Sequence, residues 1–85
     1  MDEKPMAIYI DIDGRKFDVS TWGGFRDAGA EISNVFRKKV ELATYHKNTA
    51  INKESAGPKY EKAIAEANAW RQAKSKELMR LTRGL

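Results

Sequence analysis

Residues 8–19 alternate apolar and polar side chains on both sides of an Asp-Gly pair at residues 13 and 14. Asp-Gly is typical of a two-residue type I′ turn, because both central residues of that turn need positive φ. A turn there gives the following cross-strand pairs: Ile8 with Val19, Tyr9 with Asp18, Ile10 with Phe17, Asp11 with Lys16, and Ile12 with Arg15. One face of the hairpin is then mainly apolar, and a slip of one residue would destroy this agreement. The sequence therefore predicts an antiparallel β-hairpin over residues 7–20.

After the hairpin the apolar residues recur at helical spacing, which predicts two helices over residues 25–48 and 58–83. The apolar stripe of the first comprises Phe25, Ala28, Ile32, Val35, Phe36 and Ala43. The stripe of the second comprises Tyr60, Ala63, Ile64, Ala67, Trp70, Leu78 and Leu81. The polar segment 48–58 ends in Gly-Pro and predicts a loop, with Pro58 at the first position of the second helix.

The expected fold class is α+β, with a two-stranded antiparallel β-hairpin followed by two antiparallel α-helices (ββαα). A chain of 85 residues suffices for one small domain, and residues 1–5 are expected to form a flexible tail. An isolated hairpin is marginally stable, so its apolar face should pack on the helices, with Trp22 and Phe25 near the junction.

No apolar run approaches the length of a membrane span, and the first residues, MDEKPMAI, do not resemble a secretory signal. We therefore expect a cytoplasmic protein that does not enter the membrane. The sequence contains no cysteine, which excludes disulfides and thiolate metal sites.

The strand that ends in Asp11-x-Asp13-Gly14 resembles the first motif of the haloacid dehalogenase-like phosphatases. The resemblance implies that Asp11 would be a nucleophile toward phosphate and Asp13 an acid or base. That fold needs a parallel sheet after the motif, whereas the sequence predicts an antiparallel partner strand directly after it. We therefore interpret the two aspartates as part of a turn.

Other chemistry finds little support in the sequence. His46 is the only histidine, and it lacks the companions that a metal site or a catalytic base requires. An alignment of Asp11, Asp13 and Gly14 to a calcium-binding EF-hand loop puts Tyr9 and Ser20 where carboxylates belong. We expect no enzymatic activity, no catalytic or metal-binding residues and no cofactor.

The formal net charge is +4, and residues 57–85 carry seven Lys or Arg against three Asp or Glu. A basic helical surface can neutralise phosphates without reading bases. The candidate nucleic-acid-binding residues are Arg37, Lys38, Lys74, Lys76, Arg80 and Arg83. Interspersed glutamates on the same helix favour the alternative of a solvated charged face.

Arg71 and Lys74 project near the middle of the second apolar stripe, as Lys39 does on the first. Burying unpaired charges is costly, so their heads should reach water or meet acidic groups, either within the chain or on a partner. Trp70 lies among alanines and is either an interface anchor or part of the core. The candidate partner-binding residues are Trp22, Trp70, Arg71 and Lys74.

The leading hypothesis is a small non-enzymatic protein-binding module that modulates a larger protein or nucleoprotein complex, as an accessory subunit or an inhibitor. Small proteins of this kind are frequent in phage and mobile-element genomes. The alternative is a sequence-nonspecific DNA- or RNA-binding protein. A third hypothesis is a homodimer that buries the two helical stripes in a four-helix arrangement.

Overall fold

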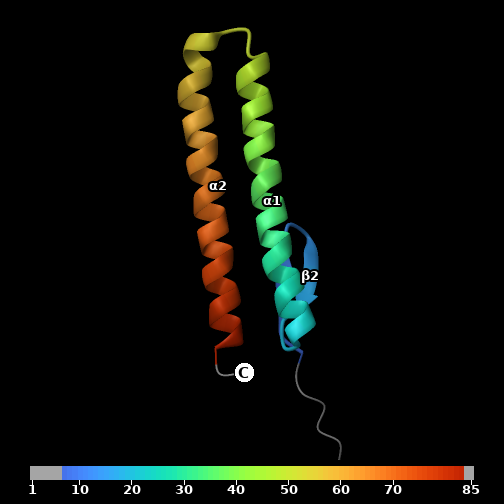
Figure 1. Ribbon diagram of the computed structural model, residues 1–85. Coiled ribbons are helices and arrows are strands. Elements are labelled where there is room, and N and C mark those ends of the chain that lie inside the picture. The colour runs from blue at the N-terminus through green and yellow to red at the C-terminus, as the bar shows by residue number, and fades with distance from the viewer. Residues whose placement is uncertain (1–6, 84–85) are drawn as a thin grey trace, which may run out of the picture.

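The computed structural model describes residues 7–83, in which a β-hairpin precedes a pair of long helices (Figure 1). The elements are β1 (Tyr9–Ile12), β2 (Arg15–Asp18), α1 (Trp22–Thr49) and α2 (Lys53–Thr82). This arrangement confirms the predicted ββαα fold of the α+β class. The tail predicted at residues 1–5 lies outside the described residues. Neither α1 nor α2 is apolar enough over sufficient length to cross a membrane.

The chain reverses at the Asp-Gly pair with the register that the sequence predicts. Asp13 has φ 54° and Gly14 has φ 88°, as a type I′ turn requires. The strand pairs run from Tyr9 with Asp18 to Ile12 with Arg15, and the Val19 N–H extends the ladder by donating to the Ile8 carbonyl at 2.8 Å. The Asp11 carboxylate accepts a hydrogen bond from the Gly14 N–H at 3.0 Å, so it stabilises the turn.

Both helices begin earlier in the chain than predicted, because side-chain caps satisfy their first N–H groups. The Thr21 hydroxyl accepts from the Gly24 N–H at 3.0 Å, so α1 starts at Trp22 instead of at residue 25.

The connection between the helices comprises only residues 50–52, so the loop predicted over residues 48–58 was too long at both ends. The Asn52 side chain accepts from the N–H groups of Glu54 and Ser55, and α2 therefore starts at Lys53. Pro58 lies inside α2. A proline at that position removes the hydrogen bond to the carbonyl of Glu54, and its ring crowds that carbonyl. Glu54 is an exposed residue, so its carbonyl can turn toward water.

The hydrophobic core lies where the hairpin packs on the two helices. Its buried residues are Ile10, Ile12, Val19, Ala28, Ile32, Val35 and Leu78, and the partly buried residues around them are Ile8, Phe17, Phe25, Trp70 and Leu81. We call residues 22–36 of α1 and 70–82 of α2 the proximal half of the helical pair. Residues 37–49 and 53–69 form the distal half.

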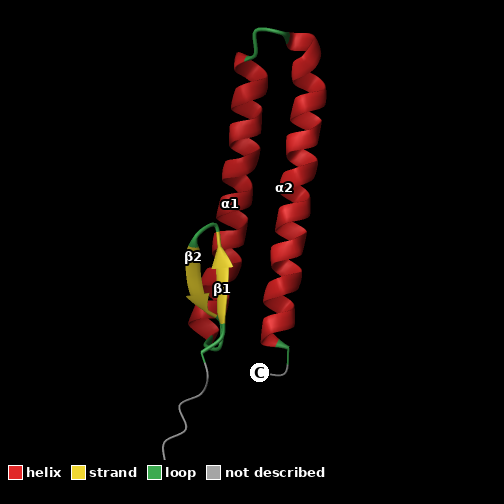
Figure 2. Ribbon diagram, turned by 180° about the vertical axis from the view of Figure 1, so that it is seen from behind, coloured by secondary structure: helices red, strands yellow, loops and turns green. Residues whose placement is uncertain are grey.

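The hairpin covers only the proximal half, as both ribbon views show (Figures 1 and 2). A strand of four residues spans about 13 Å, whereas α2, with 30 residues, is about 45 Å long. The buried hydrophobic residues of the distal half are all alanines, namely Ala43, Ala56 and Ala67. Large apolar side chains therefore stabilise one end of the molecule, and small ones line the contact at the other.

Candidate partner-binding site

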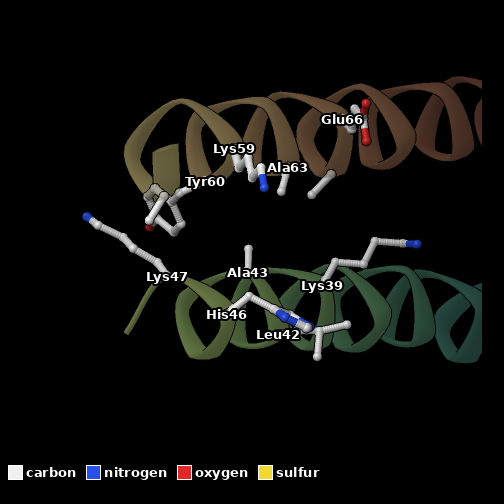
Figure 3. A pocket seen from close by; sticks show the side chains of 11 residues that line it. Lys39, Leu42, Ala43, His46, Lys47, Lys59, Tyr60, Ala63 and Glu66 are labelled. Atoms are coloured by element: carbon white, nitrogen blue, oxygen red, sulfur yellow. The ribbon is translucent and has the colours of Figure 1, made fainter. Parts of the chain in front are cut away.

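A groove of about 330 Å³ opens between the distal halves of α1 and α2 (Figure 3). We call it the distal groove. Its floor consists of the short side chains of Ala43, Ala56, Ala63 and Ala67. Its rim is formed by Lys39, Leu42, His46, Lys47, Lys59, Tyr60 and Glu66. Ala43 and Ala63 point into the space between the helices, which their small volume leaves open.

The distal groove continues the face of the helical pair that carries the hairpin. Residues that are seven positions apart on a helix lie on the same face. Ala67, on the groove floor, is seven residues before Lys74, which contacts β1. On α1 the same step joins Leu42 of the rim to Val35 of the core. One face of the helical pair is therefore covered by the hairpin in its proximal half and is open in its distal half.

Three cation–aromatic contacts cross between the helices. The Lys47 ammonium lies 4.6 Å from the centroid of the Tyr60 ring, and the Lys39 ammonium lies 5.1 Å from that of Trp70. The Arg71 guanidinium carbon lies 4.4 Å from the centroid of the Phe36 ring. Such contacts contribute about 0.5–1 kcal/mol each at exposed sites. The contact between Lys47 and Tyr60 ties the helices together beside the alanine floor, whereas the other two lie at or near the proximal half. Two of the three contacts fix lysines at the groove rim.

The charge around the groove is predominantly positive. Three lysines line it, namely Lys39, Lys47 and Lys59, against the single carboxylate of Glu66. Leu42, on the same rim, is 58% exposed, so apolar surface lies beside these charges. A groove with a small-residue floor and a cationic rim can bind an apolar segment that carries negative charge at its edges.

Two of the predicted partner-binding residues make contacts within the chain. The Lys74 ammonium donates to the backbone carbonyl of Asp11 at 2.6 Å and pairs with Glu77 at 3.3 Å. Trp70 is half-buried, packs against the core and lies beneath Lys39. Both residues therefore help to join α2 to the rest of the proximal half.

Trp22 and Arg71 lie elsewhere on the surface. Trp22 is 74% exposed and stacks on Phe25, with ring centroids 5.9 Å apart. It shares a surface hollow with Thr82, which lies twelve residues, or about 18 Å, along α2 from Trp70. Arg71 also donates to the Asn68 side chain at 3.3 Å. The structure thus does not gather Trp22 and Trp70 into one surface.

Three of the six candidate nucleic-acid-binding residues lie on one surface, and the other three lie elsewhere. Lys76, Arg80 and Arg83 line one surface hollow near the end of α2, and among residues 7–83 no Asp or Glu lines it. Arg37 lies 3.9 Å from Glu41 on α1, and Lys38 is exposed on the same helix. Lys74 is held against β1.

The distal groove is not among the sites predicted from the sequence, although the sequence contains a signal for it. Hairpin strands of about six residues extend roughly 20 Å, and a helix of 24 residues extends about 36 Å. A hairpin of that size therefore leaves part of the helical pair uncovered. The alanines at positions 56, 63 and 67 mark the α2 side of the uncovered part.

Ionisable groups near the turns have structural partners. The Ser20 hydroxyl and, to a smaller extent, the Ser20 N–H donate to the Asp18 carboxylate and lower its pKa below the ordinary value. Within residues 7–83, no group of three or more His, Asp or Glu side chains is arranged to hold a metal ion.

No protein-family model, curated protein or solved structure matches this chain.

Proposed function

We propose that this protein is a small non-enzymatic protein-binding module that docks a segment of a larger protein in the distal groove. The observation that carries the proposal is the half-covered face of the helical pair. The β-hairpin supplies an apolar cover in the proximal half, and the same side of the distal half is an alanine-lined groove without one. A partner segment would complete the layer that the hairpin begins.

Exposed apolar side chains near the groove support this proposal. Leu42 lies on the rim, and Tyr45 is exposed on the next turn of α1. An exposed leucine at the rim of a groove offers apolar surface to a partner. A module of this kind would act on its partner as an accessory subunit or an inhibitor.

A photo-crosslinking amino acid at position 63 tests the proposal, with position 65 as the matched control. Ala63 lines the groove, whereas Ala65 is an exposed alanine of the same helix that does not line it. The crosslinks are formed in lysate of the native host after nuclease treatment and identified by mass spectrometry. We expect one dominant foreign protein at position 63 that is absent at position 65. Equal crosslinking at both positions, or none, would refute groove docking, and crosslinks only to a second copy would favour the homodimer.

Nucleic-acid binding is the second candidate, and the hollow lined by Lys76, Arg80 and Arg83 supports it. Phosphate-dominated binding to duplex DNA weakens with salt, with a log–log slope of about −0.9 per neutralised phosphate. Arg80→Ala should then weaken binding about equally on unrelated duplexes. A protein that does not bind duplex DNA or RNA at low salt would eliminate this candidate.

A further inference from the structure

We infer that the distal groove accepts an amphipathic α-helix whose apolar stripe is flanked by acidic residues. This inference rests on the proposed function and names the kind of partner. It follows from three properties of the groove: the backbone that forms its walls, the size of its floor residues and the charge of its rim.

The walls favour a helix over an extended segment. Both walls are helices, so their backbone N–H and C=O groups are already paired within α1 and α2. A strand laid in the groove would bury backbone groups with no ladder to join, which is costly. A helix satisfies its own backbone and presents only side chains.

The floor has the dimensions that a helix needs. The lining residues of α2 run from Ala56 to Ala67, which corresponds to about 16 Å along the helix axis, or about three turns. The four floor alanines place little side-chain volume between the groove and the helix backbones. Apolar side chains at i, i+3, i+4 and i+7 of a third helix could therefore reach the floor, as in other helix-in-groove complexes.

The rim determines the charge of the partner. Lys39 and Lys47 line the α1 side, and Lys59 and Glu66 line the α2 side. Acidic residues beside the partner's stripe would meet Lys39 and Lys47 on one edge and Lys59 on the other, away from the Glu66 carboxylate. A second copy of this chain would instead bring the same excess of lysine to its own groove, and like charges facing one another across an interface are unfavourable. The charge therefore favours a different, acidic protein over self-association.

A displayed library of amphipathic helices of about 15 residues tests the inference. Each member carries leucines at helical spacing, and each flanking position is randomised to Glu, Gln or Lys. Selection on the intact protein should enrich Glu over Lys at the flanking positions by roughly tenfold. In the Lys59→Glu variant this preference should fall or reverse. Lys62→Glu is the matched control, because Lys62 is exposed on the same helix outside the groove, and it should leave the preference unchanged.

Amide chemical-shift mapping with the selected acidic helix locates the binding site. We expect the largest changes at the lining residues of the distal groove. Enrichment without charge bias, enrichment of lysine, or equal effects of the two Lys→Glu variants would overturn the inference. Failure to enrich any helix would overturn it as well. None of these outcomes decides the proposed function, because the crosslink at position 63 detects a protein partner of any shape or charge.

Discussion

The contact between Lys74 and the hairpin allows a quantitative test of how α2 is joined to β1. Lys74 was a candidate partner-binding residue on sequence grounds, yet its ammonium donates to the Asp11 carbonyl at 2.6 Å, across 63 residues of sequence. Lys74→Met keeps a side chain of similar length and removes the charged donor. It also removes the 3.3 Å ion pair with Glu77.

The expected loss follows from the exposure of this contact. A hydrogen bond from a charged group contributes about 1.5–3 kcal/mol when both groups are shielded from water. The Lys74 side chain is 22% exposed, and Asp11 is an exposed residue, so water can replace part of the interaction. We expect Lys74→Met to lower the free energy of unfolding by about 1–2 kcal/mol, and Tm by about 5–15 °C for a domain of this size.

Urea denaturation followed by circular dichroism measures the effect, and Lys76→Met is the matched control. Lys76 lies on the exposed side of α2, so its substitution should change stability by less than about 0.5 kcal/mol. If the two variants are equally stable, Lys74 does not hold the hairpin to α2. A loss of partner binding in Lys74→Met without a loss of stability would instead return Lys74 to the partner-binding site.

Three further predictions concern the turn and α1. Gly24→Ala should destabilise the protein by at least about 2 kcal/mol in thermal unfolding, because the alanine Cβ would lie 1.6 Å from the Asp18 carbonyl oxygen. A variant as stable as the wild type would contradict this close approach. Gly29→Ala meets no atom within 4 Å and should stabilise α1 by about 0.5–1 kcal/mol, and a loss of stability would show an unrecognised contact. Because folding lowers the pKa of Asp18, its carboxylate stabilises the protein above pH about 4, and that stabilisation is lost as the pH falls through the lowered pKa. Asp18→Asn should therefore flatten the acid limb of a stability–pH curve, and an unchanged limb would contradict the Ser20 contacts.

The sequence predicted the hairpin residue by residue, because local chemistry determines its register. The Asp-Gly pair specifies the turn, and the alternation of apolar residues permits only one pairing. Gly57 and Pro58 predict a helix start at residue 58, five residues after the observed start of α2 at Lys53. The Asn52 side chain provides a cap that allows α2 to begin before these two residues, and the Glu54 carbonyl is left without a helical donor at Pro58.

The distal groove was harder to predict from the sequence than the hairpin, because it depends on where the hairpin docks along the two helices. The helical stripes contained residues that pack in the core, among them Ala28, Ile32, Val35 and Leu78. They did not indicate that Lys74 would donate to a backbone carbonyl of β1. Every residue has a backbone carbonyl, so the sequence does not show which of them a lysine will contact. They also did not show where the hairpin stops along the helices, and that position determines which alanines remain uncovered.

Hydrogen exchange of the free protein tests the central claim most directly, namely that the hairpin stabilises one half of the helical pair and leaves the other half open. The comparison is between residues 56–62 and 73–79 of α2, which lie equally far from the two ends of that helix. We expect amides in 56–62 to exchange at least about tenfold faster, because the hairpin does not cover this half and its buried hydrophobic side chains are alanines. Equal protection of the two segments would contradict the account.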